Sequence, residues 1–218
     1  MVVKGVGIDR NPDIRRVIGI DSSSLGVAWT LLVDGKMEHQ GKIKLDKKKT
    51  MQGKLLEIYN ELTELLEWTQ PDHVFIEKSI FVKNPATART LSYIVGALIC
   101  VCLGNGIEAT DVEPSTWKAF FHYRNLSRKF VTEAKKSMGA TEATKLCNRM
   151  RKSQTWRVIR HNYSEQAVGS LADSDHDIAD SWGVALHGVN LIAQQVDLEI
   201  TDSIRLDLEE LDSLGLKL

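Results

Sequence analysis

Acidic residues whose spacing could hold a divalent cation occur at three places in the chain. Asp21 ends the apolar segment VIGID, and Glu77 ends a second apolar segment, HVFIE. Asp177 and Asp180 belong to DSDHDIADSW (173–182), where four aspartates fall within eight positions. Carboxylates brought close together repel one another unless a cation lies between them, and oxygen ligands are those that Mg²⁺ and Mn²⁺ prefer. These acids therefore predict a Mg²⁺ site in which Mn²⁺ can substitute.

The four aspartates of 173–182 are not equivalent. Asp177 and Asp180 are three residues apart, so on a helix they share one face, which is turned away from the apolar face of the same helix. Asp175 is better placed as a cap before the helix, and Asp173 as part of the preceding loop. An aspartate at a strand end or helix start is usually a turn or cap residue. The order strand, strand, helix makes the set more specific than any one acid.

The elements that must position these acids follow from the spacing of apolar residues. Residues 17–45 predict a three-stranded antiparallel meander, with Asp34-Gly35 as a tight hairpin turn. The following pattern predicts, in order, a helix ended by Pro71, a strand at 73–77, a helix at 85–103, a strand at 107–112 and a helix from Pro114. We therefore expect an α/β fold with a five-stranded mixed sheet, its first three strands antiparallel, flanked by helices.

The chain of 218 residues has 43% apolar and 26% charged residues, which suits one principal domain. We place this domain at 17–196, with 1–16 as an N-terminal extension and 197–218 as an acidic C-terminal tail, predicted to be a short helix or partly disordered. The three cysteines form no CxxC pair, so neither zinc nor a disulfide framework is predicted. No apolar stretch is long enough for a membrane span, and a cytoplasmic location, in a bacterium or a phage-infected cell, is expected, with an organelle left open.

The net charge of −1 hides a basic middle of the chain. Between Lys118 and His161 there are twelve Lys and Arg residues and only two acids, within a predicted helical segment at 118–172 whose elements the sequence does not define. Such a segment suits a polyanion, although a solvated helical surface has the same composition.

Three segments resemble those of RuvC-type Holliday junction resolvases, within the RNase H-like nuclease superfamily: VIGIDSSSLGVAWTLL, FIEKSIFVKNPATAR and HDIADSWGVALHG. The family has an Asp on the first strand, a Glu ending the fourth strand and a [DH]xxD pair on the last helix. The resemblance covers roughly 17–117 and 174–190. Carried over, the pattern falls on Asp21, Glu77, Asp177 and Asp180.

The resemblance implies an RNase H-like fold and Mg²⁺-dependent hydrolysis of DNA phosphodiesters at branched DNA, the four-way junction above all. Two cations would be held by the four acids, with Asp21 contacting both, Glu77 on the leaving-group side, and Asp177 and Asp180 on the side of the attacking water. The products would carry 5′-phosphate and 3′-hydroxyl ends.

The resemblance also implies DNA contacts and a homodimer. Lys83 matches a K-N-x-x-x-A stretch of the family, and with Arg89 and Lys118 it is expected to grip phosphates. Phe81 is the candidate base-stacking residue, although it stands four residues after Glu77 where the family has an aromatic three residues after. The helix at 85–103 is expected to form the dimer interface. The alternatives are another RNase H-like nuclease (a ribonuclease H or a transposase core) and an ATPase of the actin and sugar-kinase type, which also begins with a strand ending in Asp.

Overall fold

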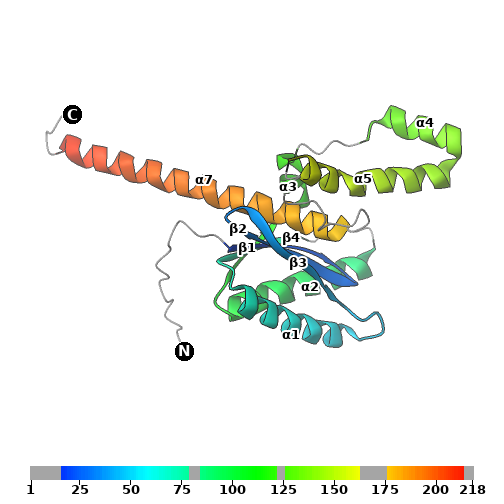
Figure 1. Cartoon of the computed structure of the whole chain (residues 1–218), viewed down its shortest axis with the longest axis horizontal. Helices are drawn as coiled ribbons and strands as arrows, with labels where there is room; N and C mark the ends of the chain where they lie inside the picture. The colour runs from blue at the N-terminus through cyan, green and yellow to red at the C-terminus, as the bar shows by residue number, and fades with distance from the viewer. Residues whose placement is uncertain (1–15, 79–83, 122–125, 163–175, 214–218) are drawn as a thin grey trace.

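The protein is a five-stranded mixed sheet with helices on both faces, as the sequence predicts (Figure 1). The structure, a computed structural model, describes residues 16–78, 84–121, 126–162 and 176–213. The strands lie in the order β3-β2-β1-β4-β5. The acids that end β1 and β4 are therefore on neighbouring strands.

The first three strands form the predicted antiparallel meander. They are β1 (Arg16–Ser23), β2 (Gly26–Val33) and β3 (Lys36–Lys44). Asp34 and Gly35 both have positive φ, at 50° and 74°, which is the conformation that a tight hairpin turn requires. The prediction made from this dipeptide is confirmed.

The other two strands run parallel to β1. They are β4 (His73–Glu77) and β5 (Glu108–Val112), connected through α1 (Met51–Thr69) and α2 (Pro85–Gly104). The helix α1 ends at Gln70 in a left-handed conformation, directly before Pro71. Since parallel strands end at the same edge of a sheet, Asp21 and Glu77 face the same end of the molecule.

Alternating side chains divide the interior into two cores. Ile18 and Ile20 of β1 point to one face and pack with α1 and α2. Val17 points to the other face, where Trp117 and Trp182 form the centre of a second core beneath the C-terminal helices. Asp21 shares the alternation of Val17, so its carboxylate belongs to this second face.

The helix α2 is apolar on nearly all sides. Its 20 residues are long and apolar enough to cross a membrane by composition alone, although no single uninterrupted apolar run in the sequence reaches that length. Core helices of globular proteins pass the same test. Here Ile94, Leu98 and Cys102 are fully buried in the first core, while Tyr93 and Leu103 on other sides of α2 are more than half exposed.

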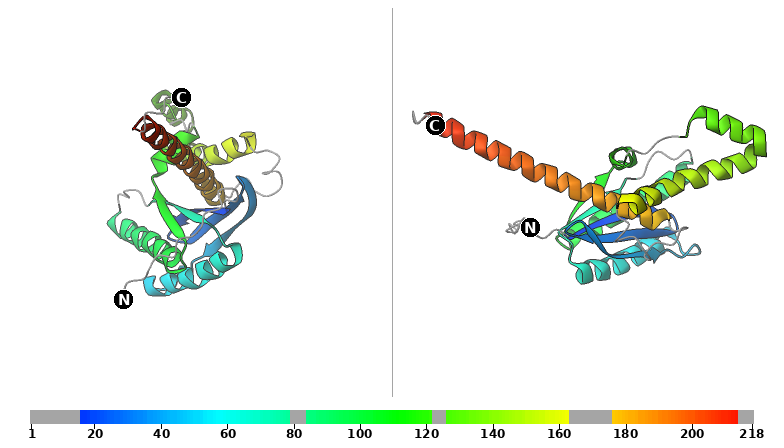
Figure 2. Two further views of the ribbon diagram at one scale, coloured as in Figure 1. Left: turned by 90° about the vertical axis from the view of Figure 1, so that its left-hand side faces the viewer. Right: turned by 45° about the horizontal axis from the view of Figure 1, so that its top comes forward.

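The helix predicted from Pro114 is α3 (Pro114–Phe120). Beyond it, the described part of the basic segment forms two helices that the sequence did not define, α4 (Arg128–Met138) and α5 (Ala140–Asn162). These two form a helical hairpin, and the hairpin projects from the body of the molecule (Figures 1 and 2).

The last helix, α7 (His176–Ser213), has 38 residues. Its first turns lie across the sheet, and its C-terminal part projects away from the sheet on the side opposite to the hairpin (Figure 2). Residues 197–213 continue this helix, so the expectation of a separate short helix or disorder in the acidic tail is wrong for them.

Candidate active site

Asp21 and Glu77 lie side by side at the carboxyl edge of the sheet. The register between the parallel strands β1 and β4 pairs Ile20 with Ile76, so the following acids are neighbours. Neighbouring strands are about 4.8 Å apart. On the other side of Asp21, the register continues through Ala28 of β2 to Lys42 of β3, which therefore stands in the same row.

Gly19 of β1 allows α7 to pack closely against the sheet, next to this row of residues. A Cβ built on Gly19 would lie 2.2 Å from the backbone oxygen of Ser181, so only a glycine permits this contact between β1 and α7. Beside it, the hydroxyl groups of Thr30 and Ser181 form a buried hydrogen bond of 2.8 Å. These contacts hold the first turns of α7 over β1 and β2. Asp177 and Asp180 are thereby brought to the same edge as Asp21.

Burial and mutual repulsion make it unfavourable for the acids of the cluster to be ionised together. Burial raises the pKa of Asp21 well above its usual value, and the nearby carboxylates of Glu77 and Asp180 raise it further. Burial likewise raises the pKa of Glu77 and of Asp180. The Lys118 ammonium group opposes these shifts, since it lowers the pKa of all three acids. The cluster therefore carries more negative charge than its surroundings neutralise.

Two neutral donors also hold the acids. The indole Nε1 of Trp117, a fully buried residue of α3, donates a 2.8 Å hydrogen bond to Oε2 of Glu77. The hydroxyl group of Thr155, on α5, donates to Oδ1 of Asp180. Lys118 lies 3.9 Å from the same oxygen of Glu77 and 4.7 Å from the centre of the Trp117 ring.

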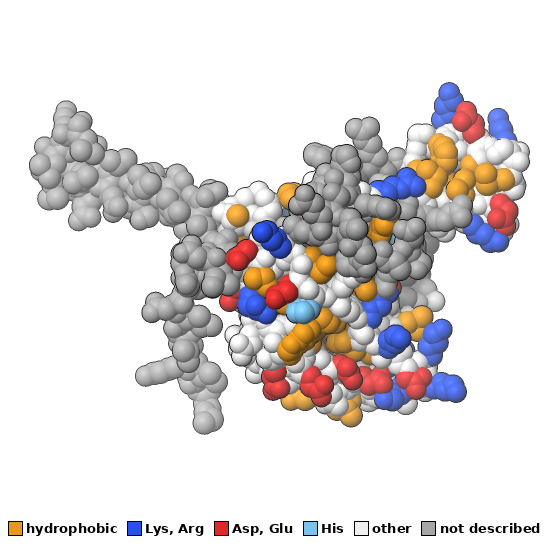
Figure 3. Space-filling model, viewed as in Figure 1, with side chains coloured by type: hydrophobic (Ala, Val, Ile, Leu, Met, Phe, Trp, Pro, Cys, Tyr) orange, Lys and Arg blue, Asp and Glu red, His pale blue; other side chains and the backbone are white. Residues whose placement is uncertain are grey.

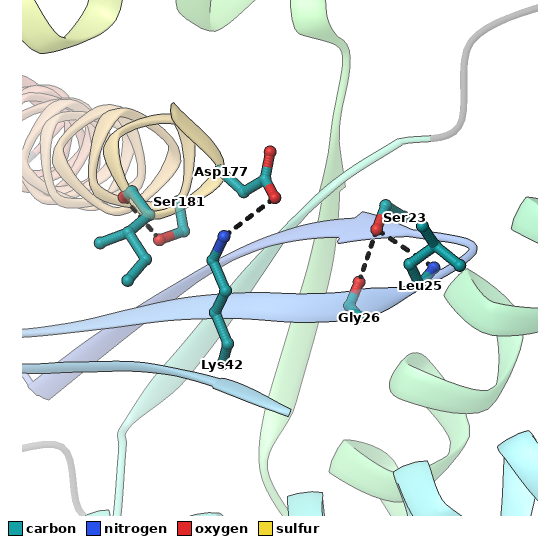
Figure 4. Close-up of polar contacts among 7 residues, drawn as sticks. Ser23, Leu25, Gly26, Lys42, Asp177 and Ser181 are labelled. Atoms are coloured by element: carbon teal, nitrogen blue, oxygen red, sulfur yellow. Dashed lines mark hydrogen bonds and ion pairs between the residues drawn. The ribbon is translucent and has the colours of Figure 1, made fainter. Parts of the chain in front are cut away.

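Asp177 occupies the outer part of the cluster. Its side chain is 51% exposed, and its Oδ2 lies 3.0 Å from Nζ of Lys42. Figure 4 shows Lys42 reaching from β3 to the start of α7. Because an exposed ion pair contributes little to stability, Asp177 can turn toward another cation at small cost.

The donor set fits a hard divalent cation. All four acids supply carboxylate oxygens, and burial first and repulsion second raise the pKa values of Asp21, Glu77 and Asp180, two effects that a bound cation would offset. Within the described part of the chain, no three acids already converge as a finished metal cage. Lys118 lies near Glu77, and Lys42 lies near Asp177. We expect small side-chain rotations when a cation binds.

The structure thus brings together five of the eight residues that the sequence singled out: the four acids and Lys118. Arg89 has an exposed side chain near the start of α2. Phe81 and Lys83 lie outside the described residues. Their roles in DNA binding remain predictions.

Sequence reasoning missed Lys42, Trp117 and Thr155. A role for Trp117 could have been suspected from the sequence, because this residue directly precedes Lys118, shortly after the strand β5. Lys42 could have been found only from the strand register, and Thr155 only from the packing of α5 on α7. No motif includes either residue.

The sequence is similar to that of known junction-cleaving enzymes. Residues 17–122 match the family model described as crossover junction endodeoxyribonuclease RuvC. The RuvC protein of Chlorobium phaeovibrioides is 31% identical over 108 residues, which are 47% of this chain and 57% of the relative. The chain thus spans little more than half the length of such relatives. The RuvC protein of Chlamydia muridarum is 23% identical, over 82% of this chain and 94% of the relative.

Two solved structures share the fold. RuvC of Thermus thermophilus, in complex with a Holliday junction substrate, matches with a TM-score of 0.55 at 15% identity, covering 79% of this chain and 90% of the other. The yeast mitochondrial Holliday junction resolvase Ydc2 matches with a TM-score of 0.52 at 12% identity, covering 83% and 81%. The comparisons confirm the predicted resemblance and the RNase H-like fold.

We expect the acidic cluster to destabilise the folded protein when no metal is bound. Because the folded-state pKa of Asp21 is raised, its ionisation disfavours folding as the pH rises above the pKa of the unfolded chain, about 3.9. Asp21→Asn should therefore raise the melting temperature in EDTA, and its advantage over the wild type should grow with pH until the folded-state pKa is passed.

The same measurement reports the cation. Mg²⁺ should raise the melting temperature of the wild type and have a much smaller effect on Asp21→Asn, since it stabilises the form that binds it. If Asp21→Asn and the wild type had equal melting temperatures in EDTA, at acidic and at neutral pH alike, the electrostatic account of the cluster would be contradicted.

Proposed function

We propose that this chain, whose residues 17–122 match the RuvC family model, is a divalent-metal-dependent endonuclease that resolves Holliday junctions and other branched DNA. The observation that carries the proposal is that Asp21 on β1 lies near Glu77 on β4 and near Asp177 and Asp180 on α7, all at one edge of the sheet, and that burial and these neighbours raise its pKa. Without a cation, such a group of carboxylates has no stabilising role. The bacterial relatives support a cytoplasmic site of action.

The four acids would hold the cations, for which Mg²⁺ is the best candidate and Mn²⁺ a substitute. Bound divalent ions would supply an activated water and stabilise the charge on the leaving oxygen. Asp21, between the other acids, would contact both ions. Glu77 would serve the side of the leaving 3′-oxygen, and Asp180 with Asp177 the side of the water. The products would then carry 5′-phosphate and 3′-hydroxyl ends.

The positively charged residues near the cluster would position the DNA backbone. Lys118 lies close enough to Glu77 to contact a phosphate at the cleavage position. Lys83, Phe81 and Arg89 follow β4 in sequence and are proposed to contact the strands near the junction. A base-stacking role for Phe81 belongs to the same proposal.

The hairpin of α4 and α5 would bind a duplex arm. Residues 128–160 contain ten Lys and Arg residues and two acids. Lys135 and Lys136 on α4 are exposed, and Figure 3 shows basic side chains at the end of the hairpin away from the sheet. Phosphate contacts of this kind contribute affinity without sequence preference.

Inactivation of the acids provides the first test. Asp21→Asn and Glu77→Gln should reduce cleavage of a four-way junction below detection in Mg²⁺, while junction binding in EDTA stays within about twofold, because phosphate contacts dominate affinity. Asp177→Asn should retain more activity, since that side chain is half exposed. Cleavage is measured on end-labelled junctions.

A substrate panel tests the specificity. Four-way junctions, three-way forks, flaps and RNA–DNA hybrids are compared under the same conditions. Preference for the RNA–DNA hybrid would favour a ribonuclease H, and ATP hydrolysis with intact DNA would favour an ATPase; either outcome would overturn the proposal.

The hairpin is tested with a charge-matched pair of variants. Lys135→Ala combined with Lys136→Ala should weaken junction binding and lower the slope of log Kd against log salt by up to about 2, at roughly 0.9 per lost phosphate contact. Lys36→Glu changes the net charge by the same amount, but Lys36 lies at the opposite end of the sheet from the acids, beside Val33. This control should leave the salt slope unchanged. Equal effects of both variants would remove the hairpin from the interface.

We further propose that α2 forms a homodimer interface. Tyr93 and Leu103 are exposed on this apolar helix, and two active sites related by symmetry suit a junction in which two strands must be cut. Sedimentation velocity should give the mass of two chains, and Tyr93→Glu should shift it toward one. A wild-type protein that remains a single chain at the concentration used for cleavage would contradict the dimer.

A further inference from the structure

Thr155 reaches the acidic cluster from a part of the chain that no motif connects with it. It lies in α5, beyond the segment that matches the family model. Its side chain is 1% exposed, and its hydroxyl group donates a hydrogen bond to Oδ1 of Asp180. A buried threonine on a helix more often satisfies its hydroxyl group with the carbonyl oxygen one turn earlier. Here the hydroxyl group is directed at a neighbouring helix.

We propose that Thr155 is a positioning residue for Asp180: its hydroxyl group fixes one carboxylate oxygen and leaves the other to hold a divalent cation. The inference rests on the proposed function, because it assigns Asp180 to the metal site. It adds that the hairpin of α4 and α5 completes this site as well as offering a basic surface.

The packing around Thr155 fixes the direction of its hydroxyl group. A Cβ built on Gly183 of α7 would lie 3.2 Å from the methyl carbon of Thr155 and 2.7 Å from the Trp117 ring. The methyl group of Thr155 therefore rests against the bare backbone of α7, and the hydroxyl group points along α7 toward Asp180. One turn further along α5, Ile159 is fully buried in the second core. A β-branched side chain held in this way has little rotational freedom.

The hydrogen bond has the right electrostatic sense for a metal ligand. An ionised carboxylate can only accept hydrogen bonds, so a hydroxyl group that donates to Oδ1 of Asp180 is compatible with the form that binds cations. Glu77 receives an equivalent bond from Trp117. Each of the two acids that flank Asp21 is thus oriented by one buried, uncharged donor.

The test measures cation binding by the intact chain without DNA. Thr155→Val keeps the shape of the side chain and removes the donor, and it should weaken the Mn²⁺ affinity measured by calorimetry by about 10-fold or more, the usual effect of losing a residue that orients a metal ligand. Thr155→Ser restores the hydroxyl group and should restore most of the affinity. Thr155→Ala serves as a second donor-free variant if the valine variant is poorly folded.

Thr144→Val is the matched control on the same helix. Thr144 is exposed, and its hydroxyl group donates to the carbonyl oxygen of Ala140, one turn earlier. This substitution removes the same group away from the acids and should leave Mn²⁺ affinity unchanged. With a four-way junction as substrate, Thr155→Val should lower kcat at saturating Mn²⁺ and leave the KM for DNA unchanged.

Two outcomes would overturn the inference, and they are distinguishable. Wild-type affinity for Mn²⁺ in Thr155→Val and Thr155→Ala would leave the proposed nuclease intact and reduce Thr155 to a structural residue. A wild-type chain that binds no Mn²⁺ would remove the metal site, and with it both proposals.

Discussion

Repulsion among largely buried carboxylates is the constraint on which the rest of this structure depends. Two carboxylates about 5 Å apart repel by about 3 kcal/mol at the effective dielectric constant of protein interiors. Asp21 is largely buried, and the carboxylates of Glu77 and Asp180 both raise its pKa further. A fold stable enough to hold this arrangement must find compensating energy elsewhere, and the two apolar cores on either face of the sheet provide it.

The compensating contacts also define the geometry of the cluster. The parallel pairing of β1 with β4 places Asp21 beside Glu77, and a slip of one residue in either strand would turn its apolar side chains, such as Ile18 or Ile76, out of the first core. The contact between Gly19 and the backbone of α7 fixes the height of the helix over the sheet. The backbone positions of the acids therefore follow mainly from the packing of apolar residues, and the hydrogen bonds and ion pairs of the acids orient their carboxylates.

This division explains how much the sequence could predict. The hairpin turn at Asp34-Gly35 and the succession of strands and helices along the chain are recorded in local patterns, and the structure agrees with both. The four acids are recorded in short motifs, and their role as metal ligands stays a prediction. The helices α4 and α5 could not be defined from the sequence because both are rich in charged residues, with ten Lys and Arg residues at 128–160. Most of the buried residues described in them are small or polar, such as Ala134, Ala143 and Thr155, so few large apolar residues mark their inner faces.

The partners of the acids could not be predicted for a different reason. The contact of Thr155 with Asp180 joins residues on two helices through tertiary packing, and that of Lys42 with Asp177 crosses from an edge strand to a helix. No periodicity in one segment records the position of another segment beside it. A motif can therefore identify metal ligands while remaining silent about what orients them.

The partners differ in a way that suits a site that must accept cations. Lys118 and Lys42 are long, flexible and about one-third exposed, at 32% and 29%, so they can withdraw into solvent when another positive charge arrives. Trp117 and Thr155 are almost fully buried and cannot move without disturbing the second core. The lysines thus neutralise the acids in a replaceable manner, whereas the indole and hydroxyl donors keep the same carboxylate oxygens in place throughout. A site built only from lysine partners would lose its geometry at the moment the cations entered. A site built only from neutral donors would leave the carboxylates without neutralising charge until the cations entered.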